Sequence, residues 1–424
     1  MNAFIFFLYL SLMSSYIQQY IQKLLTLLIY LPFIWFGTGL CLLDEGRSIM
    51  TKVLVVAIVA LLIKYRQSSW SLKSKTKQQR YTCLAMLIFA LYLFGLQLYH
   101  GADEGLIRVV LLTSAYFYLF PLERFDKNWL IGALIANGAF LFIFIYHYEF
   151  ILHSERLVGI EPNRVGPLNA IPFATYCLLA AISQCYHALI HKNWVIKCLL
   201  IVSAVVSTSA IFFTESRGVF LALISVFILY FIHFLYKKSK STIFKTIPMI
   251  IILLGGMAVL QKNEIQSRYD QTLSEIQQLQ NNNMGTSIGL RFQFWISGAH
   301  TIMDYPVFGI GNDHFRPEFK KHYDEGLITQ VAYQYNTMHY HNQYIDMAVK
   351  NGLIGLLLFL SIAWCIYKGS QISLPKYLLL GLFIASLTDV PFAHLALGYF
   401  ALLLLLFSMA IPPSQEDNND INRS

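Results

Sequence analysis

Long apolar runs separated by short polar stretches dominate the chain. Each run is close to the roughly 20 residues that a helix needs to cross a bilayer. Their unbroken hydrophobicity differs from the alternating pattern of a transmembrane β-barrel. Because backbone groups inside lipid must pair with one another, we expect the runs to be helices. The expected spans are 21–43, 48–63, 81–99, 106–122, 129–148, 169–189, 194–213, 218–236, 243–261, 343–367, 374–390 and 393–411.

Composition supports an all-α integral membrane protein. Of the 424 residues, 56% are hydrophobic and 13% are charged, against about 25% charged residues in soluble proteins. These values exclude a soluble globular enzyme, a disordered chain and a secreted disulfide scaffold. The six cysteines all lie in apolar runs, so we expect neither disulfides nor a thiolate metal site. We therefore predict about twelve transmembrane helices.

Basic residues are distributed unevenly between the two sides of these spans. Sixteen Lys and Arg residues lie in five loops on one side, whereas the short loops on the other side hold six. The positive-inside rule places the richer side, together with both termini, in the cytoplasm. The formal charge of +8 is thus a matter of membrane topology, and we expect no nucleic-acid partner.

One long polar segment, about residues 261–342, interrupts the pattern between spans nine and ten. It holds six Lys or Arg, eight Asp or Glu and five His, so it is too polar to span a membrane and too long for a turn. Within it, residues 286–304 have helical apolar spacing, a Ser/Thr start and Pro306 beyond the end. Gly309 and Gly311 predict a tight turn. We expect one large, mostly helical periplasmic loop.

The expected domain organisation therefore has four parts. They are an N-terminal transmembrane bundle of about nine spans at 1–260, the periplasmic loop domain at 261–342, three C-terminal transmembrane helices at 343–413 and a disordered cytoplasmic tail at 414–424.

Two arginines are candidates for binding a phosphate. Arg217 begins a span directly after Thr214-Glu215-Ser216, where the free N–H groups and positive dipole end of a helix favour an anion. An arginine that snorkels to the interface explains the same position. Arg291 lies among apolar residues of the predicted loop helix. It is either a solvated surface arginine or a cation directed at a ligand.

Histidines precede span ten. His341 at the interface serves either as a hydrogen-bonded helix cap or as a side chain that takes a proton near neutral pH. On a helix, His339 and His341 would point to different faces, which predicts a poor metal pair. Asp346 would orient the imidazole only if the helix start is irregular. The candidate supporting residues are His339, Asn342, Asp346, Arg156 and Arg164, the last two being either a basic rim or ordinary surface charge.

Two sequence motifs that the chain lacks restrict the reactions that it could catalyse. The chain has no P-loop, so it is not by itself an ATP-driven pump. It also has no Asp-x-Asp pair of the kind that holds a metal and a nucleotide sugar. We therefore expect a metal-free site and no cofactor.

Several motifs, taken in order, resemble the bacterial O-antigen ligase family. His341-Asn342, followed after nine residues by Gly352-Leu353-Ile354-Gly355, is similar to the family signature His-[Asn/Ser/Gln]-x9-Gly-x-x-Gly. The stretch 214–218 resembles the Thr-x-x-Arg-[Gly/Ala] element that opens a membrane helix in the family. Further landmarks of the family's large loop match Arg268-Tyr269, 289–292 and 306–311. The resemblance covers roughly residues 150–400, although 312–337 matches none of these landmarks.

The resemblance implies a metal-independent, inverting glycosyltransferase of the inner membrane that acts in lipopolysaccharide biosynthesis. Such ligases transfer O-antigen polysaccharide from undecaprenyl diphosphate to the lipid A–core oligosaccharide on the periplasmic face. The diphosphate-binding arginines of the family carry over to Arg217 and Arg291, and its proposed base carries over to His341. The partners implied are the two lipid-linked substrates and the membrane lipid itself.

Three alternatives stay open. An O-antigen polymerase or a protein O-oligosaccharyltransferase would use a similar donor with another acceptor. A transporter for lipid-linked sugars would instead predict charges deep in several spans and inverted repeats. The candidate functional charges lie at outer helix ends and no clear repeat is present, which favours an enzyme. The sugars, the acceptor hydroxyl and the oligomeric state are not determined by these patterns.

Overall fold

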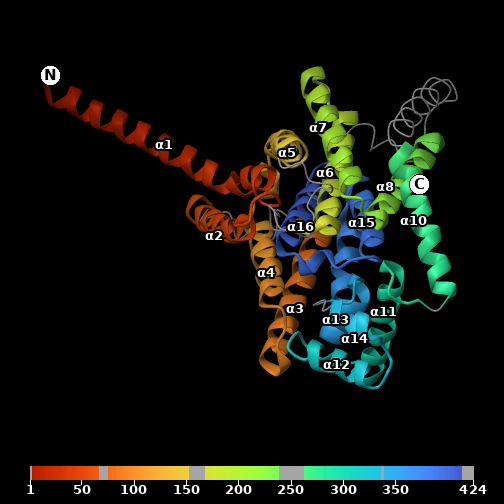
Figure 1. Cartoon of the computed structure of the whole chain (residues 1–424). Coiled ribbons are helices and arrows are strands. Elements are labelled where there is room, and N and C mark those ends of the chain that lie inside the picture. Colours follow the sequence, from red (N-terminus) through yellow and green to blue (C-terminus); the bar gives the residue numbers. More distant parts are fainter. Residues whose placement is uncertain are drawn as a thin grey trace.

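The computed structural model describes residues 2–65, 75–151, 168–237, 262–281, 283–335 and 339–412. Within these ranges every regular element is a helix, and Figure 1 shows how the helices are arranged. Three short helical turns connect longer ones: η2 Leu122–Arg124, η3 His147–Ile151 and η4 Pro391–Ala393. The all-α prediction is thus confirmed for the described part of the chain.

Eleven of the twelve predicted spans coincide with a helix, and the run 243–261 lies outside the described residues. The helices of the first part are α1 Asn2–Thr38, α2 Gly46–Lys64, α3 Lys77–His100, α4 Glu104–Leu119, α5 Lys127–Tyr146, α6 Ala170–Ile190, α7 Trp194–Phe213 and α8 Arg217–Lys237. Those that close the chain are α14 Gln343–Gly369, α15 Leu374–Ala385 and α16 Leu395–Met409.

Seven of the described helices are long and apolar enough to cross a membrane. They are residues Ile17–Thr38 of α1 together with α2, α3, α5, α6, α7 and α14. Three shorter apolar helices are Arg217–His233 within α8, α15 and α16. Multiple apolar helices are the pattern of a multi-pass membrane protein. The number twelve remains a prediction.

Helix α16 is the centre of the bundle. Every residue from 396 to 409 is buried, as expected for a helix that is apolar on all sides. It packs against α2, α4, α6, α14 and α15, and it occupies the middle of the ribbon in Figure 1. Phe400 stacks on Phe36 of α1 with ring centroids 4.2 Å apart, and Phe407 meets Phe33 at 4.9 Å.

One predicted span ends early. The apolar run 374–390 forms a helix only as far as Ala385, after which the chain turns through residues 386–394 before α16 begins. Pro391, whose ring cannot continue a regular helix interior, lies in this turn. We call residues 386–394 the α15–α16 connection. The early end of α15 matters because it places Asp389 outside a helix.

Four of the described helices lie between α8 and α14 in the chain. They are α10 Lys262–Gln280, α11 Ser287–Asp304, α12 Phe315–Asp324 and α13 Gln330–Tyr335. The prediction for residues 286–304 is confirmed, because Thr286 caps α11 by accepting a hydrogen bond from the Gly289 N–H at 3.1 Å. We refer to residues 262–342 as the cap.

The cap has an apolar cluster of its own. Phe294, Phe315, Phe319 and Tyr340 are its largest buried members, and Val349 of α14 joins them. Since α11 also packs along α14, the cap rests on that helix. Gly309 and Gly311 have φ values of 68° and 72°, which confirms the predicted turn.

Candidate active site

The cap meets the bundle at a sharp turn just before α14. His341 has a φ of 49°, a left-handed conformation that non-glycine residues rarely adopt. Asn342 then caps α14, its side-chain oxygen accepting from the N–H groups of Tyr344 and Ile345 at 3.0 and 3.2 Å. Its amide nitrogen donates to the Leu387 carbonyl at 3.2 Å. Asn342 is therefore a helix cap that also ties this turn to the α15–α16 connection.

A second residue strengthens that tie. The Gln343 N–H donates to the Ser386 carbonyl at 2.9 Å, and its side-chain oxygen accepts from the Phe392 N–H at 2.9 Å. Both ends of the α15–α16 connection are thus held against the first turn of α14. This arrangement brings Asp389 beside His341, although 48 residues separate them in the sequence.

Asp389 is the carboxylate nearest to the His341 imidazole. Its Oδ1 lies 3.3 Å from His341 Nδ1, and the two side chains are 4% and 16% exposed. Phe294 of α11 lies almost parallel to the imidazole, with centroids 5.8 Å apart. The ring is therefore confined between the cap and the α15–α16 connection. A carboxylate at Nδ1 leaves Nε2 as the nitrogen able to accept a proton.

His339 and His394 complete this cluster. The rings of His339 and His341 are 4.4 Å apart, and those of His339 and His394 are 6.3 Å apart. The expectation that His339 and His341 point to different faces of a helix is wrong, because both residues precede α14 and the left-handed turn brings them together. Burial lowers the pKa of His339 to about 3, although the Asp389 charge acts in the opposite direction. His339 is thus neutral near pH 7.

Arg217 reaches the same region from α8. A left-handed residue, Glu215 at a φ of 56°, turns the chain sharply before α8 begins. A side-chain carbon at Gly218 would collide with Thr388, so the start of α8 packs directly on the α15–α16 connection. The Arg217 guanidinium donates to Glu275 at 2.9 Å and to Gln271 at 3.1 Å, both on α10. This close approach is possible because Gly218 has no side chain.

Arg291 approaches from α11. Its Nη1 donates to Ser287 at 2.9 Å, while its buried Nε has no hydrogen-bond partner among the described residues. Burial lowers the pKa of Arg291 and the charge of Arg217 adds to this, whereas Asp389 and Glu275 oppose it. The charges of Arg291, Arg217 and Asp389 therefore act on one another within one region. An unpaired buried N–H is a donor that a ligand can satisfy.

Asp346 contacts other groups than the His341 imidazole, which the sequence analysis considered as its partner. Its Oδ1 accepts from the Tyr340 N–H at 3.2 Å, and its Oδ2 lies 3.1 Å from the Lys350 ammonium. It thereby holds the backbone on the other side of His341 rather than contacting the imidazole. Arg156 and Arg164 lie outside the described residues.

The glycines of the motif around α14 have a structural explanation. Gly352 has a φ of 70° and a ψ of 176°, which breaks α14 locally. The freed Val349 carbonyl accepts from the Ile310 N–H at 2.9 Å, and the Leu353 N–H donates to the Pro306 carbonyl at 2.8 Å. A side chain at Gly352 would collide with Val307. The break in α14 thus receives the turn at 306–311 and joins cap to bundle.

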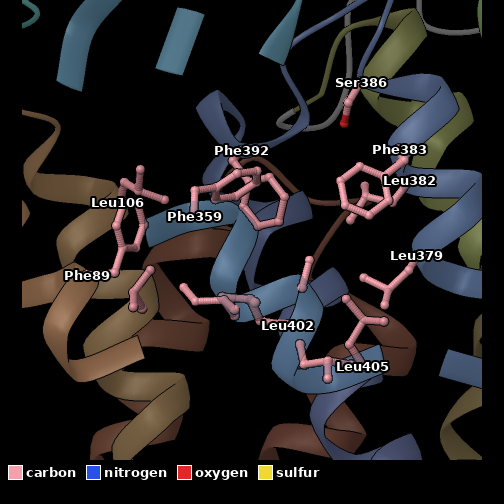
Figure 2. A pocket seen from close by; sticks show the side chains of 14 residues that line it. Phe89, Leu106, Phe359, Leu379, Leu382, Phe383, Ser386, Phe392, Leu402 and Leu405 are labelled. Carbon is pink, nitrogen blue, oxygen red and sulfur yellow. The ribbon is translucent and has the colours of Figure 1, made fainter. Parts of the chain in front are cut away.

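An apolar cavity lies on the bundle side of this cluster. Side chains from α3, α4, α14, α15, α16 and η4 surround it, as Figure 2 shows. Phe89, Leu106, Phe359, Phe383 and Leu402 are among them, and Ser386 is the one polar residue of the lining. Since Ser386 and Phe392 both bond to Gln343, the cavity adjoins the turn that holds His341. An apolar chain would find a matching surface there.

Comparison with known proteins agrees with these features. A family model described as O-antigen ligase matches residues 202–360. Residues 202–360 of the chain are therefore similar to the O-antigen ligase family. An O-antigen ligase of Escherichia coli is 26% identical over 165 residues, which are 37% of this chain and 38% of that relative. An uncharacterized protein of Haemophilus influenzae is 28% identical over 191 residues, 44% of this chain and 46% of that protein. The chain thus spans less than half the length of each relative.

The O-antigen ligase match contains only part of the cluster. Arg217, Arg291 and His341 lie inside it, whereas Asp389 and His394 lie beyond residue 360. Sequence reasoning missed these two residues. One available signal was an aspartate within the apolar run 374–390, since a carboxylate at membrane depth is costly and usually functional.

Proposed function

We propose that this member of the O-antigen ligase and polymerase family is an O-antigen ligase. It would transfer polysaccharide from undecaprenyl diphosphate to the lipid A–core oligosaccharide by metal-independent inverting transfer. The observation that carries the proposal is the convergence of His341, Asp389 and Arg291, with Arg217 close by, around the turn before α14. The charge asymmetry of the loops supports an inner-membrane protein with both termini cytoplasmic and this site on the periplasmic face.

The two arginines suit a diphosphate leaving group. As the bond between sugar carbon and phosphate oxygen breaks, negative charge grows on the diphosphate, and nearby guanidinium groups stabilise it. The unpaired Nε of Arg291 supplies a donor that is already in place. Arg217 is paired with Glu275, so a bound diphosphate would replace that carboxylate or share the guanidinium with it.

His341 suits the role of general base. The acceptor hydroxyl would lose its proton to Nε2 as its oxygen attacks the anomeric carbon from the face opposite the diphosphate. Asp389 beside Nδ1 would hold the neutral ring in the required tautomer and stabilise the imidazolium that forms. A new glycosidic bond forms, the bond to the diphosphate breaks, and undecaprenyl diphosphate leaves. The configuration at the anomeric carbon is thereby inverted.

The apolar cavity of Figure 2 has walls that match a polyprenyl tail, and at about 40 Å³ it would have to widen to admit an isoprene unit. Its walls are aliphatic and aromatic side chains, and its polar end is Ser386, next to the turn that holds His341. A lipid-linked donor whose tail enters here would keep its diphosphate at the polar cluster. This supports a donor with a long hydrocarbon chain rather than a nucleotide sugar.

The proposal is tested by replacing His341, the proposed general base, in cells whose only copy of the gene encodes the variant protein. With His341→Ala, we expect polymer attachment to lipopolysaccharide to fall by about 10²–10⁴-fold, the usual contribution of a general base. The readout is the ladder of polymer-bearing lipopolysaccharide on a gel, with membrane protein levels matched. His300→Ala is the control, because His300 is exposed on α11 and outside the cluster. Normal attachment by the His341→Ala protein would reject the assignment.

The same strain separates ligase from polymerase. A deletion strain that accumulates long polymer on the lipid carrier supports a ligase. Accumulation of single repeat units on the carrier would instead identify a polymerase.

A further inference from the structure

Three side chains at the turn before α14 have the spacing of a metal site. His339, His341 and Asp389 each offer one ligand atom, and these atoms all lie within 4.8 Å of one another. His341 Nδ1 and Asp389 Oδ1 are 3.3 Å apart. With bonds of about 2.0–2.1 Å in a tetrahedral zinc site, neighbouring ligand atoms are roughly 3.3 Å apart. This pair already has that spacing, and a small movement of His339 would complete the set.

The hydrogen bonding of the same atoms points to a missing ligand. His341 Nδ1 and Asp389 Oδ1 are both buried, and neither makes a well-formed hydrogen bond with any described residue. The two atoms face one another at 3.3 Å, which is close enough to favour one tautomer of the ring but too poorly aligned to satisfy either atom fully. Leaving buried polar atoms in this condition is unfavourable. A cation between them would satisfy both.

The ligand types select the class of metal. Two imidazoles and one carboxylate favour zinc and similar transition-metal dications, whereas Mg²⁺ and Ca²⁺ prefer oxygen ligands alone. Three protein ligands leave the fourth position to water or to His394, whose ring is 6.3 Å from that of His339. The positive charges of Arg291 and Lys350 act on this cluster and oppose a dication. We therefore expect binding that is reversible by chelators.

We propose that His339, His341 and Asp389 form a binding site for Zn²⁺ or a similar transition-metal dication, and that the bound ion inhibits the enzyme. Inhibition rests on the proposed function. An ion at His341 Nδ1 would take Asp389 away from the imidazole and place two positive charges beside the ring that must accept a proton. The ion would thus oppose the general base rather than assist it.

The binding part is tested on full-length protein in detergent, with any affinity tag removed and bound metal stripped by a chelator. ZnCl2 is titrated calorimetrically, and Co²⁺ is used to record the absorption of a tetrahedral site. We expect the dissociation constant to rise at least about tenfold in His339→Ala and in the nearly isosteric Asp389→Asn. His300→Ala should bind like the unaltered protein. Equal binding by all four proteins, or binding by none, would overturn the site.

The inhibition part uses the same proteins in a transfer assay with a defined donor and acceptor. Zn²⁺ should slow the unaltered protein, and chelator should restore its rate. Whatever transfer His339→Ala retains should be less sensitive to Zn²⁺. Zinc bound at this cluster without loss of transfer would refute inhibition. A protein that transfers nothing at all would reject the proposed function, while the titration would still decide the metal site.

Discussion

The bundle and the cap are held together by different means. In the bundle, α16 is apolar on every side, and Phe407 alone contacts the rings of Phe33, Tyr116, Phe117 and Phe120. The cap has a smaller aromatic cluster that is supplemented by polar contacts. A small core supplies little stabilisation beyond the entropy cost of ordering the chain. The cap is therefore the region in which single changes should have the clearest consequences.

The candidate site depends on both regions at once. Phe294 and Tyr340 of the cap cluster lie beside His341, while Asp389 and Gln343 belong to the bundle side. A site at such a junction is formed only while the cap is docked. Changes that separate cap from bundle should therefore abolish activity even when both parts stay folded.

The largest effect is expected at the junction itself. In Gly352→Ala, the new methyl group meets the Val307 carbonyl, and the residue keeps a left-handed φ of 70°. We expect a loss of at least about 4 kcal/mol in the free energy of cap docking. Hydrogen exchange of the amides at 307–311 should report it. Gly95→Ala on α3 is the control, because a methyl group there meets no other atom within 4 Å. Unchanged exchange in Gly352→Ala would refute the role of the break.

A matched pair of core changes compares the two regions directly. Phe319→Ala in the cap cluster and Phe407→Ala in the bundle should each cost about 3 kcal/mol. In the first variant, we expect fast exchange in α11, α12 and α13 with bundle helices still protected, because the cap core is small. In the second, thermal unfolding of the bundle should shift while cap exchange stays nearly the same. Parallel loss of protection in both regions would show that they unfold as one unit.

A smaller effect is expected at the start of α11. Thr286→Ala removes the oxygen that accepts from Gly289 N–H, which should cost about 1 kcal/mol of helix stability. Thr286→Ser retains that oxygen and is the control. The measurement is the exchange rate of the first amides of α11. Equal exchange rates in the two variants would mean that the hydrogen bond between Gly289 N–H and the Thr286 side chain does not stabilise α11.

The smallest effect is a pH dependence of cap stability. His322 is buried, and its Nδ1 lies 2.7 Å from Ser297 Oγ. Burial lowers the pKa of His322 from its ordinary value of 6.5. The positive charge of Lys321 lowers this pKa further, whereas the negative charge of Glu318 opposes the shift. Below about pH 6.5 the unfolded cap therefore binds more protons than the folded one, and stability falls as the pH decreases. His339 contributes a slope of the same sign. In His322→Asn, the decrease in exchange protection between pH 7.5 and 5.5 should be smaller. An unchanged decrease would exclude His322.

Much of the fold could be predicted because its signals are local. Apolar runs predicted the described helices of the bundle, and Thr286, Gly309 and Gly311 predicted the start of α11 and the turn at 309–311. Helices α10, α12 and α13 lie in the polar segment, where no individual prediction was made. The same logic failed at 386–390, where an apolar run continues past the end of α15. Hydropathy measures how favourably a side chain leaves water, and it does not specify the backbone conformation. Val390 and Phe392 of the α15–α16 connection are buried by tertiary packing without being part of an α-helix.

The candidate site likewise has features that local sequence patterns predicted and features that only the packing of the helices decided. By itself, the sequence determined which chemical groups are present and roughly where the apolar helices begin, including Arg217 at the start of α8, whereas the structure shows that Asn342 and not His341 caps α14. Only the tertiary structure decided that Asp389 rather than Asp346 faces His341, that His339 lies beside His341, and that α14 breaks at Gly352. Helix periodicity and capping depend on residues a few positions apart. Which carboxylate lies next to an imidazole depends on how all the helices pack, and no local pattern contains that information.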